Sequence, residues 1–449
     1  MSKQRIQLSD HFTYPRLLRF VLPCIGTMLF TSIYGIVDGL CVSNFVGKTA
    51  FAAVNLIMPL PMLLGTIGFM LGTGGSAIVG ITLGEGDQKK ADRYFTLFLL
   101  AALVSVSVLA VLGIVFLRPI AVLLGAKGEL LDYAVRYGRI LMLALPTFAL
   151  QNMFQSFFVT AEKPHLGFWF TVGAGCTNMV LDVLMVGIWS WGVEGAAIAT
   201  FISQLVGGVL PVFYFIDRSN SSRLHLCKTS FYSKVLRDAC INGSSELMTN
   251  LSMSLVNILY NYQLLRLAGE NGVAAYGVIM YAAFLFVAVF VGYAVGSAPI
   301  VSFHYGARNH TEVHNLYRKS LRLIAVVAVT LTLASMFIIP CVARIFVGYD
   351  AELLALTSRA FRLYALSFLI MGFNVYASSF FTALGDGVTS ALISFLRTLA
   401  FQVIAILLLP LLLGIDGIWL AVTAAELAAL AVSAAMLLTK DKVFHYRKA

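Results

Sequence analysis

Four acidic residues lie in stretches that are otherwise apolar enough to cross a membrane: Asp38, Asp182, Glu246 and Glu426. A carboxylate within a membrane-spanning helix is energetically costly, so we expect such residues to be retained for function. Burial disfavours the charged form of a carboxyl group, which makes protonation near neutral pH possible. Carboxylate oxygens also suit a hard cation such as Na⁺. These residues therefore suggest the binding and release of a proton or an alkali cation.

Asp182 has polar neighbours on its own stretch and on the next. Asn178 precedes it by four residues, which places both side chains on one helix face, and Thr200 lies in the following apolar stretch. Together with Asp38, these two carboxylates, one amide and one hydroxyl could ligate Na⁺ or share a proton. For Asn178 and Thr200, a purely structural role in helix–helix hydrogen bonds is the alternative.

The seventh apolar stretch carries Glu246, with Asn250 one turn further on and Asn257 two turns beyond that. One face of this helix is therefore polar, and interhelical hydrogen bonds would explain its asparagines as well as a functional role does. Glu426 lies near the centre of a stretch of small residues. Arg397 is the one basic residue within a span and could be its ion-pair partner.

The elements that must position these residues are membrane helices. Of the 449 residues, 59% are hydrophobic and 12% are charged, and the mean hydropathy is +0.88. Soluble chains carry about 25% charged residues. We therefore expect an all-α integral membrane protein. Apolar stretches of about 20 residues or more predict twelve spans: 16–41, 50–80, 94–117, 135–160, 166–188, 192–216, 238–265, 273–303, 320–346, 360–383, 388–413 and 417–438.

Lysine and arginine residues favour one side of the membrane. With the N-terminus inside, the inner segments and adjoining span ends hold 21 of the 31, the outer ones hold 9, and Arg397 lies within a span. This bias predicts cytoplasmic termini in a bacterial-type plasma membrane, and it explains the net charge of +10 without nucleic acid as a partner. The expected parts are a cytoplasmic tail (1–15), a first lobe (16–216), a cytoplasmic linker (217–237), a second lobe (238–438) and a cytoplasmic tail (439–449).

The two halves of the chain resemble each other. Gly84 matches Gly306 at an offset of 222, and the Ser-Phe-Phe run at 156–158 matches that at 379–381 at an offset of 223. Six spans is an even number, so both repeats insert the same way round. We expect an axis along the membrane normal and a cavity between the repeats near the midplane. This architecture is typical of a transporter.

Sequence patterns of enzymes and nucleotide sites are not found. The run 72–77 formally fits G-x-G-x-x-A, but it follows a membrane helix, so we interpret its small residues as helix-packing positions. No Walker sequence and no Ser/His/Asp set occurs. We therefore expect neither an enzyme nor a cofactor.

Several motifs together resemble the multidrug and toxic compound extrusion (MATE) transporters over nearly the whole chain. These are Val37-Asp38 with Phe45-Val46-Gly47 and Ala52-Ala53-Val54-Asn55, then Asn178-x-x-x-Asp182-x-x-x-x-Gly187, and Asn261 with the run 269–277. The stretch SSELMTNLSMS looks most like the MepA-like branch. The resemblance implies twelve helices in two six-helix repeats, forming a V-shaped, two-lobe bundle around a cavity open to one side at a time.

The resemblance also implies a function and its residues. It implies multidrug efflux by antiport, in which lipophilic or cationic compounds leave in exchange for H⁺ or Na⁺. The first-lobe cation site carries over to Asp38, Asn178, Asp182 and Thr200, with Asp38 and Asp182 as Na⁺ ligands if Na⁺ is the coupling ion. Pro23 matches a helix 1 proline linked to bending of that helix, so we expect it to be a hinge.

The substrate side of the resemblance concerns the second half. Glu246 aligns with a helix 7 glutamate of the NorM-type branch, which also has a helix 10 aspartate where this chain has Asn374. We expect Glu246, Asn250, Asn257 and Asn374 to contact organic cations or drugs in a monomer surrounded by lipid. The alternative is a lipid-linked oligosaccharide flippase of the same superfamily. Its anionic substrate would require arginines in the cavity, and only Arg397 lies within a span.

Overall fold

The structure is a computed structural model that describes residues 6–45, 48–348 and 350–447; the side chain of Asp38 and those of most residues around it lie outside the described part. The described residues form helices and no strand. The helices are α1 (Tyr14–Phe45), α2 (Lys48–Ile57), α3 (Pro59–Gly84), α4 (Gln88–Leu123), α5 (Glu129–Thr160), α6 (Pro164–Asp182), the π-helix η1 (Val183–Ile188), α7 (Gly192–Gly208), α8 (Leu210–Ile216), α9 (Ser233–Asn242), α10 (Ser244–Gly306), α11 (His310–Val347), α12 (Ala351–Ala365), α13 (Phe368–Ala383), α14 (Gly387–Phe395), the π-helix η2 (Leu396–Ala400), α15 (Phe401–Leu413), α16 (Ile415–Thr439) and α17 (Asp441–Phe444).

The described helices account for twelve membrane spans. Ten are long and apolar enough to cross a membrane, and α12 with α13, bent by 46°, forms an eleventh. The 63-residue α10 supplies one more, because Gly269 interrupts it with φ 60° and ψ −150°, a conformation that favours glycine. A straight helix of that length would measure about 95 Å, yet the rings of Tyr260 and Tyr276 stack with centroids 4.9 Å apart. The chain therefore reverses at Gly269, and the expected all-α, twelve-span fold is confirmed.

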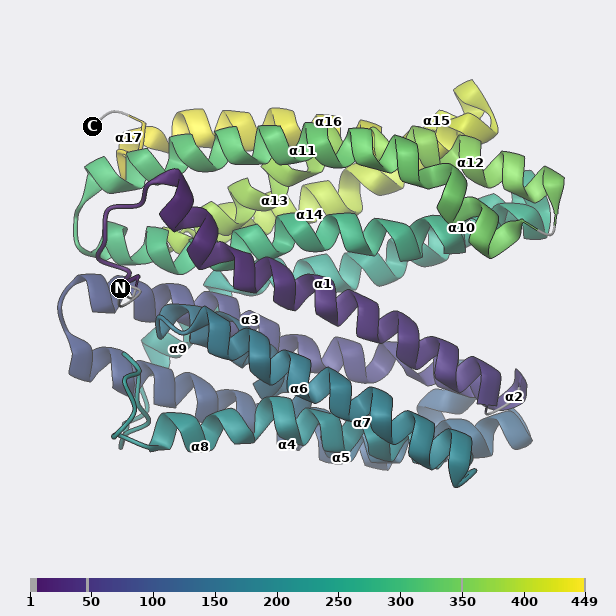
Figure 1. Cartoon of the computed structure of the whole chain (residues 1–449), viewed down its shortest axis with the longest axis horizontal. Helices are drawn as coiled ribbons and strands as arrows, with labels where there is room; N and C mark the ends of the chain where they lie inside the picture. Colours follow the sequence, from purple (N-terminus) through teal and green to yellow (C-terminus); the bar gives the residue numbers. More distant parts are fainter. Residues whose placement is uncertain (1–5, 46–47, 349, 448–449) are drawn as a thin grey trace.

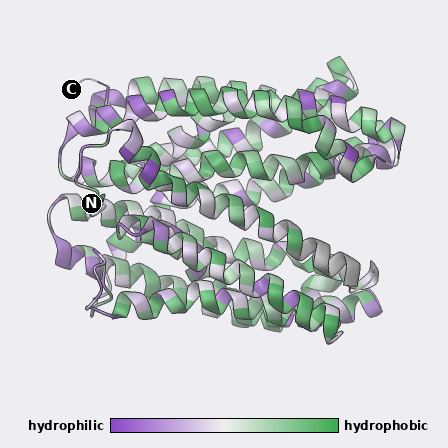
Figure 2. Cartoon of the chain, viewed as in Figure 1, coloured by the Kyte–Doolittle hydropathy of each residue, from purple (hydrophilic) through white to green (hydrophobic). Residues whose placement is uncertain are grey.

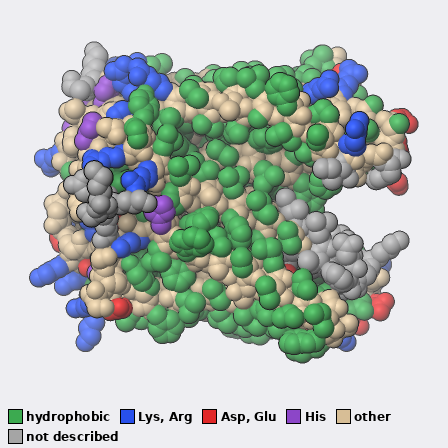
Figure 3. Space-filling model, viewed as in Figure 1, with side chains coloured by type: hydrophobic (Ala, Val, Ile, Leu, Met, Phe, Trp, Pro, Cys, Tyr) green, Lys and Arg blue, Asp and Glu red, His purple; other side chains and the backbone are tan. Residues whose placement is uncertain are grey.

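The helices form two lobes that meet at one end of the molecule. Helices α3 to α8 lie in one lobe and α10 to α16 in the other, and both termini lie at the end where the lobes meet (Figure 1). At the opposite end the surface is hollowed between the lobes (Figure 3). Hydrophobic residues predominate along the helices, whereas hydrophilic ones gather at the end that holds the termini (Figure 2).

Short polar turns begin several helices at the end that holds the termini. Asp87 accepts a hydrogen bond from the backbone N–H of Lys90 at 3.0 Å, and Asn309 accepts one from Glu312 at 3.1 Å. These N-caps satisfy backbone donors that the first turn of a helix leaves unpaired. Asp87 and Asn309 are 222 positions apart, so the third helix of each repeat begins in the same way.

Glycines of α3 and α10 form the contact between the lobes. A Cβ on Gly84 would lie 2.0 Å from the carbonyl oxygen of Phe303, and a Cβ on Gly306 would lie 2.1 Å from that of Ile81. The two backbones thus approach too closely for any side chain at these positions. Gly84 and Gly306 are the glycines that match between the repeats, so the pseudo-twofold axis passes near this contact.

Helix α1 contacts both lobes. Its N-terminal part packs on α10, where a Cβ on Gly292 would lie 2.5 Å from the Cα of Ile25. Its later part packs on α6, where a Cβ on Gly175 would lie 2.5 Å from the ring of Phe30. In Figure 1 this helix runs diagonally from one lobe to the other. A bend in α1 would therefore change the relation between the lobes.

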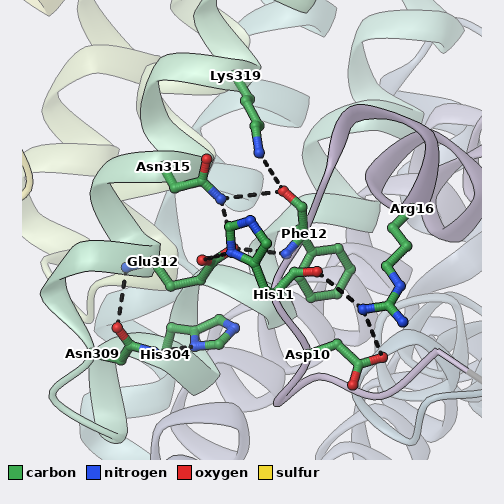
Figure 4. A network of polar contacts seen from close by, with 9 residues as sticks. All are labelled: Asp10, His11, Phe12, Arg16, His304, Asn309, Glu312, Asn315 and Lys319. Carbon is green, nitrogen blue, oxygen red and sulfur yellow. Dashed lines mark hydrogen bonds and ion pairs between the residues drawn. The ribbon is translucent and has the colours of Figure 1, made fainter.

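The N-terminal segment 6–13 hydrogen-bonds to both lobes where they meet, and Figure 4 shows its contacts with the second lobe. The backbone N–H of Phe12 donates to Glu312 Oε1 at 2.9 Å, and His11 Nδ1 lies 2.6 Å from Glu312 Oε2. The Leu8 N–H donates to Glu162 Oε1 of the first lobe at 2.9 Å. A segment of eight residues is thus held by buried carboxylates of both lobes.

The connection between the halves, 217–232, lies on the first lobe. The backbone N–H of His225 donates to Asp92 Oδ1 at 3.0 Å, and that of Cys227 to Thr96 Oγ1 at 3.1 Å. Arg223 pairs with Glu162 at 2.6 Å. Each half is therefore preceded by a segment that hydrogen-bonds to the third helix of the other half: α11 for segment 6–13, and α4 for segment 217–232.

Candidate functional site

Asn178 and Asp182 lie together on the buried face of α6. Their side chains are 2% and 0% exposed. Directly after Asp182 the helix widens into η1, which runs from Val183 to Ile188. Such π-helical segments often occur at functional sites, because the extra residue re-aims neighbouring side chains. The expected pairing of these two residues on one helix face is therefore present, next to an irregularity in the helix.

The helices that carry the other expected ligands flank α6. Helix α6 packs against α1, which carries Asp38, and against α7, which carries Thr200. The side chain of Asp38 lies outside the described residues. Thr200 is half-buried, and its carbonyl accepts a hydrogen bond from Ser203 Oγ at 2.8 Å.

The donor set of the first lobe suits a proton or Na⁺. Asp182, Asn178 and Thr200 offer carboxylate, amide and hydroxyl oxygens, the ligands that a hard cation prefers. Asn178 Nδ2 is buried without a hydrogen-bond partner among the described residues. No group of three His, Cys, Asp or Glu side chains that could hold a metal gathers within the described part. An alkali cation here would depend on neutral oxygens as well as on Asp182.

The first lobe contains further buried amides that sequence analysis did not single out. Asn152 Nδ2, Gln155 Oε1 and Gln204 Oε1 are all buried and lack hydrogen-bond partners among the described residues. Asn152 and Gln155 lie on α5 and Gln204 on α7. Amides within otherwise apolar spans were the available signal, because buried polar groups are normally paired. Their open hydrogen-bonding capacity makes the interior of this lobe suitable for water or an ion.

Pro23 is buried within the first third of α1. A proline inside a helix removes one backbone hydrogen bond and permits a bend. The hydroxyl of Thr27 donates to the Pro23 carbonyl at 2.9 Å. The next residue, Cys24, lines a narrow pocket between α1, α5, α6 and α10, which Gln155 also lines. The expected hinge therefore lies one residue before a small gap in the packing between these helices.

The second lobe holds a buried ion pair. Glu426 on α16 is 0% exposed, and its Oε1 accepts a hydrogen bond from Arg397 Nε on η2 at 2.8 Å. Its Oε2 accepts from Asn374 Nδ2 on α13 at 2.8 Å, and its carbonyl accepts from the same nitrogen at 2.9 Å. The prediction that Arg397 pairs with Glu426 is confirmed. Asn374, expected on the substrate face, is itself fully buried in this cluster.

The remaining substrate candidates follow one face of α10. Helix α9 ends at Asn242, and Glu246 lies half-buried in the first turn of α10, where the helix dipole favours a carboxylate. Asn250 is half-buried and donates to the Glu246 carbonyl at 2.9 Å. Asn257 is exposed. Exposure along this face therefore increases toward Gly269.

Comparisons with known proteins match both halves of the chain. The MatE family model matches residues 23–184 and 247–408, two blocks whose starts are 224 positions apart. The multidrug export protein MepA of Staphylococcus saprophyticus is 21% identical over 433 residues, 95% of this chain and 94% of the relative. MepA of Staphylococcus aureus is 21% identical over 432 residues, 96% of this chain and 95% of the relative.

Solved structures have the same fold. One, described as the outward-facing conformation of a multidrug resistance MATE family transporter of the MOP superfamily, gives a TM-score of 0.92 at 22% identity and covers 100% of both chains. A MATE in complex with MaL6 gives 0.90 at 22% identity, over 96% of this chain and 97% of that chain.

Proposed function

Because the chain belongs to the MatE family of membrane transporters, we propose that it is a secondary active multidrug antiporter. It exports lipophilic or cationic compounds in exchange for H⁺ or Na⁺ by alternating access. The relatives that are named multidrug export proteins support this substrate class. A transporter of this kind requires no cofactor other than its coupling ion.

The observation that carries the proposal is the combination of lobe geometry and buried carboxylates. The lobes meet at one end through Gly84 and Gly306, and the surface between them is hollowed at the other end (Figure 3). Asp182 and Glu426 are each 0% exposed, one in each lobe. A two-lobe protein with titratable groups inside the lobes can couple ion binding to exchange between two open states.

In the proposed cycle, Asp38 and Asp182 take up the coupling ion from the open side. Neutralising their charge changes the packing of α1 on α6, and Pro23 lets α1 bend in response. Because α1 contacts both lobes, bending alters the first lobe and the cavity next to it. The organic compound is then released to the side from which the ion came.

The substrate face is proposed to run along α10 from Glu246 toward Gly269. Glu246 supplies the negative charge, Asn250 and Asn257 supply polar contacts, and Asn374 supports the face through its contact with Glu426. A carboxylate in a partly hydrated cavity attracts lipophilic organic cations. This charge argues against a flippase for an anionic lipid-linked sugar, since Arg397 is already bound to Glu426.

The proposal includes an orientation. On the face drawn in Figure 3, Lys and Arg side chains gather at the end that holds both termini, which supports cytoplasmic termini in a bacterial-type plasma membrane. On that orientation the described conformation opens outward. A cysteine at Ser221, in segment 217–232, should react with a membrane-impermeant thiol reagent only after cells are opened. Labelling of intact cells would contradict this orientation. We propose a monomer, to be checked by its mass in detergent.

Reconstitution tests the proposed function. Protein in liposomes should expel ethidium when either a pH gradient or a Na⁺ gradient is imposed, and the effective gradient identifies the coupling ion. Protein-free liposomes and liposomes without a gradient are the controls. Failure to move ethidium or any other organic cation under either gradient would contradict the proposal.

A further inference from the structure

We propose that the Arg397–Glu426 pair is a proton-operated switch that decides whether Glu246 can hold an organic cation. The inference rests on the antiport function proposed above. It assigns to the second lobe a site at which a proton on Glu426 and an organic cation on Glu246 cannot be bound at the same time.

The geometry of the pair points to more than packing. Arg397 Nε and Glu426 Oε1 are 2.8 Å apart, and the side chains are 13% and 0% exposed. Removing two charges from water costs several kcal/mol per ion, and apolar residues could fill the same space without that cost. Asn374 Oδ1 is also fully buried and has no hydrogen-bond partner among the described residues. This open acceptor lies beside Glu426 and can receive a hydrogen bond from water or from a protonated carboxyl group.

The charge of Arg397 acts on two carboxylates, because η2 packs against both α16 and α10. Besides its hydrogen bond to Glu426, its guanidinium interacts electrostatically with Glu246 on α10. Tyr364 on α12 interacts electrostatically with both Arg397 and Glu426. Among the described residues, Arg397 and Tyr364 therefore lie close to Glu426, Glu246 lies within reach of the Arg397 charge, and Asn374 is the neutral ligand.

The repeat indicates that the charged pair is a specific feature of the second lobe. Three residues of this cluster occupy repeat positions whose first-lobe counterparts are neutral: Asn374 matches Gln151 at the offset of 223 found within the same helix, and Arg397 and Glu426 match Gly175 and Gln204 at 222. The amide position is kept in both halves. At these repeat positions, the charges of Arg397 and Glu426 are both present in the second half and both absent from the first, as expected of groups that interact with each other.

The exchange balances in atoms and charge. In one state, Glu426 is ionised and bound to Arg397, which leaves the Glu246 carboxylate available to a monovalent organic cation. When a proton from water adds to a Glu426 oxygen, an O–H bond forms and the ion pair is lost. Arg397 keeps its charge and pairs with Glu246, and the organic cation leaves. One proton enters for each monovalent cation that departs, so the summed charge of the cluster is unchanged.

A chain of hydroxyl groups offers a route for the proton. Ser378 lies one turn from Asn374 on α13, and its Oγ is 2.8 Å from Ser390 Oγ and 2.9 Å from Ser394 Oγ on α14. The Thr382 hydroxyl donates to Ser390 Oγ at 2.8 Å. All four hydroxyl-bearing residues are buried. The chain extends from Ser378, one turn beyond Asn374, toward the end of α13 at Ala383, which precedes the capping residue of α14.

Equilibrium binding of ethidium to the purified full-length protein tests the switch. Fluorescence titrations between mildly acidic and mildly alkaline pH would compare the wild type with Glu426→Gln, Arg397→Gln and the double variant. Glu194→Gln, an exposed acid of the first lobe, is the matched control. Thermal unfolding of each variant shows which proteins are folded. The first-lobe acids also titrate, so the comparison is between variants at each pH.

The expected results differ between single and double variants. Glu426→Gln mimics the protonated state, so it should weaken ethidium binding about tenfold at alkaline pH, the effect of losing about 1.4 kcal/mol. The double variant removes the competing guanidinium and should restore wild-type affinity. Arg397→Gln should bind ethidium with less sensitivity to acid than the wild type does.

Three outcomes would overturn the switch. They are wild-type behaviour of Glu426→Gln, a double variant that binds as weakly as the single one, and an unchanged acid sensitivity in Arg397→Gln. If Glu426→Gln does not fold, infrared difference spectra of the wild type decide: ethidium binding at mildly acidic pH should remove a protonated-carboxyl band, and persistence of that band overturns the switch. Absence of ethidium binding to the wild type would overturn both this inference and the proposed function.

Discussion

At the scale of single residues, the two lobes bury acidic groups in different surroundings. Asp182 lies on one helix face with the amide of Asn178, in a lobe whose other buried polar groups include Asn152 and Gln204. Glu426 is bound instead by a guanidinium and an amide. Neutral oxygens around a carboxylate suit the binding of Na⁺, whereas Glu426 already has a cationic partner in Arg397.

Asp38→Asn and Asp182→Asn should each abolish gradient-driven efflux. The amide has nearly the same size as the carboxylate, so packing is largely kept while the titratable group is lost. Expression and thermal stability should stay near those of the wild type. The measurement is ethidium efflux from liposomes, with Glu194→Gln as an exposed control in the same lobe. Normal transport by either aspartate variant would place ion coupling elsewhere.

Glu246→Gln should weaken transport of cationic dyes and spare neutral ones. Loss of one charged contact in a partly hydrated cavity costs on the order of 1–3 kcal/mol. The comparison is efflux of a cationic and a neutral dye from the same vesicles under the same gradient. An equal loss for both dyes would show that Glu246 serves coupling or folding rather than recognition of the substrate's charge.

Sequence analysis identified the residues that are unusual for their surroundings. The cost of charge in a membrane was enough to select Glu426 and Arg397 and to predict their contact. The same criterion did not select Gln204, because an amide side chain carries no charge. It also placed Asn374 on the substrate face, whereas the structure shows Asn374 bound to Glu426, a contact between α13 and α16 that depends on tertiary packing.

At the scale of the helices, Asp386 links the start of α14 to the end of α16. It caps α14 by accepting from the Thr389 N–H at 3.2 Å, and it pairs with Lys440 at the end of α16 at 2.8 Å. Burial acts to raise the pKa of Asp386, but hydrogen bonds and charge from Lys440 and Thr389 outweigh it, and the pKa is lowered. A lowered pKa in the folded state stabilises the fold above the unfolded-state pKa, and this contribution is lost as pH falls through the folded-state value.

Asp386→Ala should lower the stability of the protein by about 1 kcal/mol, the usual effect of losing an N-cap. Asp386→Asn keeps the cap and removes only the charge, so it should fall between the alanine variant and the wild type near neutral pH. Thermal unfolding in detergent, followed as the pH is lowered, measures both. The gap between the wild type and Asp386→Asn should close in acid; a gap that widens would contradict this account.

The sequence predicted the number of spans better than their shape. Apolar length alone gives twelve, and all twelve are present in the described helices. It did not predict the end of α9 at Asn242, the 46° bend between α12 and α13, or the π-helices after Asp182 and at Arg397. Such irregularities arise where one helix adapts to its neighbours, and apolar periodicity carries no information about those contacts.

At the scale of the whole molecule, segment 6–13 holds the lobes together. Glu312→Gln removes the charge that His11 and the Phe12 N–H contact, and it should loosen the end where the lobes meet. Ser302 is fully buried and lies against Gly80 at this contact. A cysteine at Ser302 should therefore react with a thiol reagent faster in the Glu312→Gln protein. The exposed Glu352→Gln is the control, and equal rates in both would show that segment 6–13 does not hold the lobes together.

Segments 6–13 and 217–232 also have a consequence for expressing the two halves as separate polypeptides. Segment 217–232 continues into the second half of the chain but hydrogen-bonds to Asp92 and Thr96 of the first half. Segment 6–13 continues into the first half but hydrogen-bonds to Glu312 of the second half. A gene split at residue 217 would therefore produce two polypeptides, and the N-terminal segment of each would hydrogen-bond to the other. Co-expressed fragments 1–216 and 217–449, with only one carrying an affinity tag, should be purified together. Recovery of the tagged fragment alone would show that the covalent connection at residue 217, rather than segments 6–13 and 217–232, keeps the two halves together.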